Sequence, residues 1–468
     1  MIPVTTYQDR PVAVFGLGAS GMVAANALQA GAAKVDVWDD SADRRETAQA
    51  TGLSAVDLYA ADMENYDTLL VAPGVPLTHP TPHALVTKAN DSGVSICGDI
   101  ELFAQMRAQL PGHQVVAITG TNGKSTTTAL ITHILNVAGG KAVACGNIGT
   151  PILELDPLAE GGVYVIEMSS YQIDLTHTLK PDLAILLNVA PDHLDRHGDI
   201  EYYAAVKRRL LEDQSADGLA IVGIDDVWGQ AAIEQLKRAG RSNVVSVSVE
   251  RSLEYGVYAR DGLVFDARVS DTSPVLDLRD IVSLPGSHNW QNAAVAYAAA
   301  TALGLSTAQI QQAMEQFPGL AHRSEFIAEA EGLSFVNDSK ATNVDAAVKA
   351  LSSFDNIHWI AGGRSKDEPL VPIADYAGNI AKAYLIGEAQ DDMAESLSAM
   401  GVEAVKCDTL DNAFSQAVAN GKAEAMATIL LSPACASFDQ FANFEIRGEA
   451  FRALVKDHLL AVEKGSCL

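Results

Sequence analysis

The chain has 468 residues, of which 48% are hydrophobic and 19% charged, and its formal net charge is −27. This length favours about three domains, and the composition is that of a soluble globular protein. Because a surface this acidic repels nucleic-acid phosphates and anionic lipid headgroups, we expect neither nucleic acid nor a membrane as a main partner.

The five cysteines are scattered, odd in number and without CxxC spacing. This usage indicates a reducing compartment and argues against a cysteine metal cluster. The amino-terminal sequence has no charged-then-apolar signal pattern, and no apolar run approaches the ~20 residues that cross a bilayer. We therefore expect a cytoplasmic protein, and we take a monomer as the starting hypothesis.

The beginning of the chain has the spacing of a dinucleotide-binding fold. Val12–Phe15 is a short apolar strand that leads into a G-x-G-x-x-G turn over residues 16–21 and a helix, Met22–Ala30. A second strand, Lys34–Trp38, ends at Asp39. Such glycines approach a diphosphate, and the acidic residue some twenty positions later binds a sugar or base. NAD or a nucleoside diphosphate attached to a substrate would fit, and the same glycines could merely pack a helix on a strand.

A third strand, Thr68–Val71, ends at the loop that contains Pro73 and Gly74. A helix that starts at Gly98 leads out of this first segment, and PGH interrupts the pattern shortly after Arg107. A second break falls at a Pro-Gly pair two hundred residues later. The predicted domains are 1–107, 108–319 and 320–468.

The clearest motif is VVAITGTNGKSTTT, residues 115–128. A buried strand, a glycine-rich turn and a helix place backbone N–H groups where they hold phosphate oxygens. Lys124 would reach the outer phosphates, and the Ser125 hydroxyl would bind Mg²⁺. Ile118 stands where the general P-loop has glycine, so the loop is a shortened, specialised variant. The alternative is an ordinary glycine-rich turn between a strand and a helix.

Polar residues follow other predicted strands of the central segment. Glu167 ends the strand Tyr164–Glu167, where P-loop proteins place an acidic Mg²⁺ ligand, although a solvated glutamate at a strand end is the alternative. His193 follows another apolar strand, Leu183–Val189, and could bind a metal or be structural, and Lys207 lies on the next predicted helix. Farther on, Asn292 could read an adenine edge or cap its helix.

The last segment again alternates strands and helices. The strand at Phe335 leads into NDSKATN, and later strands lead into GGRSK and SPACASFDQF. This order predicts a doubly wound parallel sheet whose carboxyl edge binds ligands. The predicted fold is therefore α/β with a Rossmann-like N-terminal domain, a central P-loop ATPase-like domain with a parallel or mixed sheet, and a Rossmann-like C-terminal domain.

Together these motifs resemble one family from end to end, the Mur ligases of peptidoglycan synthesis. The residues that carry the resemblance are TGTNGKST, GNIG, EMSSYQ, LNVAPDHLDRH, PGSHNWQN, HRSE, NDSKATN and LSPACASFDQF. The phosphate loop, the DH segment and the HNxxN helix are shared with folylpolyglutamate synthetases. NDSKATN and SPACASFDQF are narrower and look like the members that add D-glutamate.

The resemblance implies roles for the residues at matching positions. The uridine-linked substrate would be bound by Ala19, Ser20, Asp39, Pro73, Gly74 and Asn147. ATP would be bound by Gly120, Thr121, Asn122, Gly123, Lys124, Ser125, Thr126, Asn292, Arg323 and Asp338. D-Glutamate would be bound by Lys340, Thr342, Lys366, Ser437 and Phe444. Two Mg²⁺ ions would be bound by Ser125, Glu167, His193 and a carbamylated Lys207, and catalysis would rest on Lys124, His193 and Lys207.

The implied reaction joins D-glutamate to UDP-N-acetylmuramoyl-L-alanine (UDP-MurNAc-L-Ala) at the expense of ATP, through an acyl phosphate. Phosphoryl transfer needs cations, and D-glutamate carries two carboxylates, which accounts for Lys340 and Lys366 in so acidic a chain. His193 is a candidate base for the amine. Arg364 stands where the family pattern has an acidic residue.

Three other functions compete with this interpretation. A nicotinamide dehydrogenase would explain the first glycine-rich turn but not TGTNGKST or NDSKATN. A nucleotide-switch protein would explain the phosphate loop but not a third domain with polar loops of its own. A sister ligase that adds a diamino acid, or glutamate to a different acceptor, is the closest rival.

Overall fold

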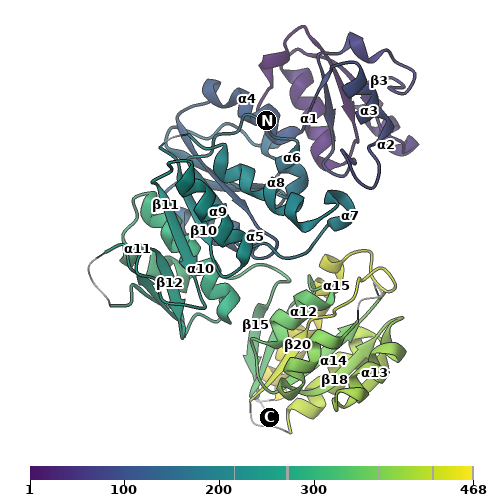
Figure 1. Ribbon diagram of the computed structural model, residues 1–468. Coiled ribbons are helices and arrows are strands. Elements are labelled where there is room, and N and C mark those ends of the chain that lie inside the picture. The colour runs from purple at the N-terminus through teal and green to yellow at the C-terminus, as the bar shows by residue number, and fades with distance from the viewer. Residues whose placement is uncertain (216, 270–272, 366–368, 424–425, 466–468) are drawn as a thin grey trace. The chain divides into compact units, whose positions relative to one another are not determined.

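The computed structural model describes residues 1–215, 217–269, 273–365, 369–423 and 426–465. Its strands form three sheets, which follow one another along the chain. The chain divides into two compact units, one of residues 1–277 with 291–315 and the other of residues 278–290 with 316–468. The first unit contains two of the sheets and the second unit contains the third (Figure 1). The predicted α/β class is confirmed, while the domain limits 107/108 and 319/320 stay a prediction.

The N-terminal sheet has the order β3-β2-β1-β4-β5, and every pair in it is parallel. Its strands are β1 (Pro11–Phe15), β2 (Lys34–Trp38), β3 (Ser54–Ala55), β4 (Thr68–Val71) and β5 (Ser95–Cys97). Its helices are α1 (Ala19–Ala30), α2 (Ala42–Ala50), α3 (Ala84–Asp91) and α4 (Asp99–Met106), with 3₁₀ turns at Thr5–Tyr7, Met63–Asn65 and Arg107–Gln109. The strand order reverses between β1 and β4, which is where sheets of this kind bind ligands.

The central sheet has nine strands in the order β14-β13-β12-β11-β10-β9-β6-β8-β7. Its strands are β6 (His113–Thr119), β7 (Ala142–Gly146), β8 (Gly162–Glu167), β9 (Leu183–Leu186), β10 (Leu219–Gly223), β11 (Val244–Ser248), β12 (Val257–Arg260), β13 (Leu263–Asp266) and β14 (Leu276–Asp277). Neighbouring strands in the series β12-β11-β10-β9-β6-β8-β7 pair in parallel. At the other edge, β13 pairs antiparallel with both β12 and β14. The sheet is therefore mixed.

Helices follow most strands of the central sheet. They are α5 (Lys124–Val137), α6 (Ser170–Asp174), α7 (Leu194–His197), α8 (Ile200–Glu212), α9 (Val227–Arg238), α10 (Ser287–Ala302) and α11 (Thr307–Glu315), with a 3₁₀ turn at Ile152–Glu154. In the register of the sheet, Ile118 of β6 lies opposite Glu167 of β8, and Thr119 lies opposite Leu186 of β9. The loops that follow these three strands are thus brought to one edge.

The C-terminal sheet has the order β15-β16-β20-β17-β18-β19. Its strands are β15 (Glu325–Ala330), β16 (Leu333–Asn337), β17 (Ile357–Gly362), β18 (Ile380–Ile386), β19 (Ala404–Asp408) and β20 (Ala427–Leu431). Its helices are α12 (Val344–Leu351), α13 (Gln390–Ala399), α14 (Leu410–Gly421) and α15 (Phe444–Gly465), with a 3₁₀ segment at Val371–Asn379. All pairs are parallel except β15 with β16, so the predicted parallel sheet has an antiparallel edge strand.

Most predicted elements agree with the structure to within a few residues. The first helix starts at Ala19 rather than Met22, and the strand predicted to run from Leu183 to Val189 ends at Leu186. No helix among the described residues is both long and apolar enough to span a bilayer. The four described cysteines are buried free thiols.

Candidate active site

The phosphate loop connects β6 to α5 and depends on two glycines with positive φ. Gly120 has a φ of 156° and Gly123 a φ of 83°. A Cβ atom on Gly120 would lie 2.9 Å from the Cβ atom of Leu187, and one on Gly123 would lie 2.4 Å from Oδ1 of Asn292. Because α5 begins at Gly123 without a side-chain cap, its N-terminus is the kind of backbone site that binds an anion.

Asn188 fixes the shape of this loop. Its backbone carbonyl accepts a hydrogen bond from the Thr121 N–H at 2.9 Å, and its side-chain Oδ1 accepts one from the Asn122 N–H at 2.9 Å. Thr126 lies in the first turn of α5. Asn292 contacts the same helix, since its Oδ1 accepts a hydrogen bond from Oγ1 of Thr127 at 3.2 Å. All the predicted ATP residues up to Asn292 therefore lie in or against the loop.

Two lysine ammonium groups meet at this loop. Nζ of Lys124 donates to the carbonyls of Gly120 and Thr121, each at 2.8 Å. Nζ of Lys207, which comes from α8, donates to the same Gly120 carbonyl at 2.9 Å and lies 4.5 Å from the centre of the Tyr203 ring. Lys207 is almost completely buried, and its pKa lies well below the ordinary value because of burial and then the charge of Lys124.

Glu167 stands at the end of β8 with one oxygen unused. Its side chain is buried, and Oε1 accepts a hydrogen bond from Nδ2 of Asn147 at 2.8 Å. Oε2 is buried and has no hydrogen-bond partner among the residues that the structure describes. A buried carboxylate oxygen without a donor is costly, so this atom is a candidate ligand for a cation.

His193 is the N-cap residue of α7 and has a left-handed conformation, with a φ of 54°. Its ring is half exposed, and Nε2 lies 3.4 Å from Oδ2 of Asp192. Burial lowers its pKa, and although Asp192 opposes the shift, the charges of Lys124 and Lys207 add to it. The ring is therefore neutral near pH 7, the form that binds metals and accepts protons.

The structure thus brings Lys124, Ser125, Glu167, His193 and Lys207 to one edge of the central sheet, as predicted. Within the described part of the chain, no group of three His, Cys, Asp or Glu side chains is arranged to hold a metal ion by itself. A metal site at this edge would need ligands beyond Glu167 and His193, such as the Ser125 hydroxyl, a carbamate or phosphate oxygens.

The N-terminal sheet presents its predicted residues at the switch point between β1 and β4. Ala19 and Ser20 form the first turn of α1, and a Cβ atom on Gly16 would lie 2.7 Å from that of Ala72 in the loop before Gly74. This close approach explains why residue 16 is a glycine. The predicted substrate loops of β1 and β4 are therefore neighbours.

The Asp39 carboxylate accepts backbone hydrogen bonds from the glycine-rich loop and from the start of the next helix region. Its Oδ2 accepts a hydrogen bond from the Leu17 N–H at 2.6 Å, and Oδ1 accepts one from the Ser41 N–H at 2.9 Å. Burial would raise its pKa, but these backbone donors and Arg44 outweigh burial and lower it. The carboxylate is buried, so the structure gives it a loop-shaping contact, and a contact with uracil stays a prediction.

In the second unit, Asp338 follows β16 and has both oxygens occupied. Oδ1 accepts a hydrogen bond from the Ser324 N–H at 3.0 Å, and Oδ2 accepts one from Oγ of Ser432 at 2.7 Å. Burial raises its pKa to about 7. Arg323, its predicted neighbour at the nucleotide, lies between His322 and Ser324, whose φ angles are 63° and 42°. The segment is strained, as segments at functional sites often are.

Two of the predicted D-glutamate residues touch. Nζ of Lys340 lies 3.8 Å from the centre of the Phe444 ring, a cation–π contact. Thr342 follows two residues later, and its N–H donates to the Lys340 carbonyl at 2.8 Å. Ser437 is buried in the loop after β20. Lys366 lies outside the described residues.

Arg364 is held in place by Glu388. Its guanidinium donates two hydrogen bonds to that carboxylate, each at 3.0 Å, and its backbone pairs with Ala436. The basic residue that departs from the family pattern is therefore neutralised by an acidic one from the next strand end.

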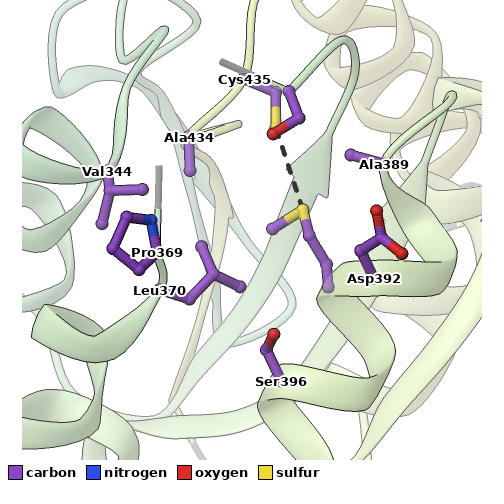
Figure 2. Close-up of a pocket in the computed structure, with 10 residues that line it drawn as sticks. Val344, Pro369, Leu370, Ala389, Asp392, Ser396, Ala434 and Cys435 are labelled. Carbon is purple, nitrogen blue, oxygen red and sulfur yellow. Dashed lines mark hydrogen bonds between the residues drawn. The ribbon is translucent and has the colours of Figure 1, made fainter. Parts of the chain in front are cut away.

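A separate cavity of about 90 Å³ lies in the C-terminal domain (Figure 2). Its wall is mostly small or apolar and comes from α12, α13 and the loop after β20, with Cys435 and Met393 in contact at 3.9 Å between their sulfur atoms. None of the described residues predicted to bind D-glutamate lines it.

Sequence reasoning missed two arginines that tie the loops together. Arg196 donates from Nη1 to the Gly74 carbonyl at 2.9 Å. Arg447 is fully buried and donates to Oγ and the carbonyl of Ser339 and twice to the Cys435 carbonyl, at 2.9 to 3.2 Å. Both lie inside recognised motifs or next to them, but their acceptors are mostly backbone carbonyls.

Comparisons with known proteins give one answer along the whole chain. The family model of the Mur ligase middle domain matches residues 118–300, and that of the Mur ligase glutamate ligase domain matches residues 322–435. A protein of Phenylobacterium zucineum named UDP-N-acetylmuramoylalanine–D-glutamate ligase is 50% identical over 460 residues, with 97% of this chain and 98% of that protein covered. One of Nitrobacter hamburgensis with the same name is 50% identical over 459 residues, with the same coverage.

The solved structures agree on the fold. The crystal structure of UDP-N-acetylmuramate-alanine ligase from Thermotoga maritima has a TM-score of 0.59 at 17% identity, and the match covers 97% of this chain and 100% of that one. At this identity the likeness bears on the fold alone, whereas the sequence relatives reach 50% over nearly all of the chain. This chain belongs to the Mur ligase family.

Proposed function

We propose that this protein is the ATP-dependent ligase that joins D-glutamate to UDP-MurNAc-L-Ala in the synthesis of peptidoglycan precursors. Relatives at about half identity over 97% of the chain carry that name. The observation that carries the proposal is the meeting of two lysines, Glu167 and His193 around one phosphate loop. An ATP-driven acid–amine ligase requires such a cationic, phosphate-binding edge.

The reaction has two steps. A carboxylate oxygen of UDP-MurNAc-L-Ala attacks the γ-phosphorus of ATP, and the bond from that phosphorus to the bridging oxygen of ADP breaks, which gives an acyl phosphate and ADP. The amine of D-glutamate then attacks the acyl carbon, the C–O bond to phosphate breaks, and an amide and inorganic phosphate are released. The amine gives up a proton in this step, and neutral His193 is our candidate to receive it.

Lys124 and the N-terminus of α5 supply positive charge for the first step. In the structure the Lys124 ammonium donates to two carbonyls of its own loop, so it is already held above the backbone that would cradle the phosphates. A cation fixed before the reaction costs no reorganisation when negative charge spreads over the transferring oxygens. This arrangement supports Lys124 as the central phosphate-binding residue.

The same edge suits magnesium. Oε2 of Glu167 is a buried acceptor with no donor among the residues that the structure describes, and His193 is neutral. With the Ser125 hydroxyl and a carbamate on Lys207 they form a donor set that Mg²⁺ accepts. When bound, the ions would neutralise charge on the phosphates. We propose two ions, as the family resemblance implies.

Lys207 is suited to carry that carbamate. Carbamylation needs an uncharged amine to attack carbon dioxide, and burial together with the Lys124 charge favours the uncharged form of Lys207. The product is an anion beside Lys124, so the modification places an attractive charge next to the Lys124 ammonium. We therefore propose a carbamylated Lys207 in the active enzyme.

We also propose that Lys340, Thr342, Lys366, Ser437 and Phe444 bind D-glutamate. The contact of Lys340 with Phe444 supports the first and last of these, because it gathers a cation from the β16 loop and a ring from the start of α15. We propose that the residues of the N-terminal switch point bind the uridine diphosphate. A monomer in the cytoplasm, with neither membrane nor nucleic-acid partner, completes the proposal.

The test is amino-acid-dependent phosphate release with ATP and UDP-MurNAc-L-Ala. D-Glutamate, L-lysine and meso-diaminopimelate are compared side by side at equal concentration, with mass spectrometry of the uridine-linked product. We expect release with D-glutamate only. Activity with a diamino acid and none with D-glutamate would assign the chain to a sister ligase.

A further inference from the structure

Arg196 lies where three loops from different strands meet. It belongs to α7, in the loop after β9 and three residues beyond His193. Its Nη1 donates to the Gly74 carbonyl, in the loop after β4, at 2.9 Å. Its guanidinium carbon lies 4.7 Å from the centre of the Tyr171 ring, at the start of α6 just beyond Glu167. One side chain thus joins the N-terminal switch point to the Glu167 and His193 loops.

A second contact brings the same two segments together. Gly198 has a φ of 82°, and a Cβ atom there would lie 2.9 Å from Nε2 of His79. The loop after β9 therefore approaches the loop after β4 at two positions near the C-terminal end of α7, Arg196 and Gly198. The positive φ at Gly198 favours glycine, and the His79 ring lies against the space that a side chain there would occupy.

The contact is not optimised for stability. Nε of Arg196 is buried and has no hydrogen-bond partner within the described part of the chain. His193, the N-cap residue of α7, has a left-handed backbone that is unfavourable for a residue with a side chain. An unpaired buried donor and a strained residue in one short segment are features that proteins retain for function rather than for stability.

We propose that Arg196 is a positioning residue that sets the distance between the uridine-diphosphate loop and the phosphate edge. This inference rests on the proposed function. A substrate anchored by its diphosphate at the N-terminal switch point must present its carboxylate at the edge that holds Lys124, Glu167 and His193. A misplacement of the reacting carboxylate by about 1 Å costs on the order of a hundredfold in rate. A side chain that fixes the distance between the two loops therefore contributes to turnover.

The decisive variant is Arg196→Ala, measured with each substrate varied in turn. We expect KM for UDP-MurNAc-L-Ala to rise about tenfold and kcat to fall about tenfold, with KM for ATP within about twofold of wild type. Guanidinium ions at millimolar concentration should restore part of the loss. Arg196→Lys should be intermediate, since an ammonium can donate to the Gly74 carbonyl but cannot stack flat on Tyr171.

Tyr171 provides an independent variant of the same contact. Tyr171→Ala should reproduce part of the effect, and the double variant should lose less than the two single losses combined, because both remove one contact. Arg238→Met is the matched control, since Arg238 is exposed and pairs only with Glu234 four residues away among the described ion pairs. We expect wild-type constants for it.

The outcomes separate two failures. If wild type releases no phosphate with D-glutamate, the proposed function fails. If wild type is active and Arg196→Ala has unchanged constants, the positioning role is wrong. Equal losses for all three substrates, together with a lowered melting temperature and no rescue by guanidinium, would show a merely structural residue and overturn the inference too.

Discussion

The central and C-terminal sheets both end in polar loops, but the buried charged side chains of the two edges differ in how completely other residues compensate them. At the central edge, Lys207 is buried against another lysine, and Oε2 of Glu167 has no partner among the described residues. At the C-terminal edge, both oxygens of Asp338 accept hydrogen bonds, and Arg447 donates four. The central edge thus holds a buried carboxylate oxygen and a buried lysine that the described residues leave poorly compensated, whereas the C-terminal edge is a frame that the protein completes by itself.

This difference indicates where chemistry and where stability reside. Removing a group from the central edge should cost more in rate than in stability, because that edge already holds two lysines together and a buried carboxylate oxygen without a donor among the described residues. Removing a buried partner from the C-terminal edge leaves several buried polar atoms unsatisfied and should cost stability first. The predictions below test each half of this contrast, beginning with the largest expected effect.

Lys124→Ala should reduce turnover by at least about a thousandfold, because the phosphate loop loses the cation that we propose faces the transferring phosphoryl group. The melting temperature should hardly change. Phosphate release and thermal unfolding measure the two quantities. Lys141→Ala, at an exposed position just before β7, is the control and should behave as wild type. A Lys124→Ala enzyme with near-normal rates would remove the loop from the mechanism.

Lys207→Ala should be nearly inactive and should regain part of its activity when a short carboxylic acid such as acetate or propionate is added. The added carboxylate would occupy the place of the carbamate, in the space that the side chain vacates beside Lys124. Initial rates over a series of acid concentrations, with chloride at equal ionic strength as control, measure the rescue. Full activity without any added acid would rule out the carbamate.

The fold and the phosphate edge were accessible from sequence because their signals are local. An apolar strand, two glycines and GKS lie within fourteen residues, and Glu167 closes a buried strand of its own. The antiparallel strands β12 to β14 were not predicted. They are two to four residues long, too short for a periodic pattern to stand out.

The two arginines were beyond sequence reasoning for a different reason. Arg196 and Arg447 bind backbone carbonyls of Gly74 and Ser339, which lie 122 and 108 residues away along the chain. Every residue type has a backbone carbonyl, so the sequence does not show which residue is the acceptor. Only the fold shows that these side chains connect loops, which is why motif reading located the site but not what holds it in place.

Arg447→Met should lower the free energy of unfolding of the C-terminal domain by about 3 kcal/mol, because the carbonyls of Ser339 and Cys435 lose their buried donor. Urea unfolding followed by circular dichroism measures this change. Arg364→Met removes an arginine that pairs with Glu388 at the exposed surface of the same domain, and we expect a much smaller loss. Equal losses for the two variants would contradict the view of this edge as a self-supporting frame.

The smallest effect concerns His197, the buried end of α7 beside the central edge. Nε2 lies 2.9 Å from Oγ of Ser170, and burial, reinforced by the charge of Lys207, lowers the pKa to about 4. Since the fold favours the neutral ring, its contribution to stability is complete above the unfolded pKa of about 6.5 and is lost as the pH falls through 4.

His197→Gln, which cannot titrate, should therefore lose less stability than wild type between pH 7 and pH 4.5, by on the order of 1 kcal/mol. Urea unfolding of both proteins at the two pH values measures the difference. Asp174 lies 3.9 Å from Nδ1 of His197, and burial raises its pKa to about 6, but it is present in both proteins and largely cancels from the comparison. Parallel pH profiles would show that His197 is not held neutral, and that the central edge does not disfavour added positive charge.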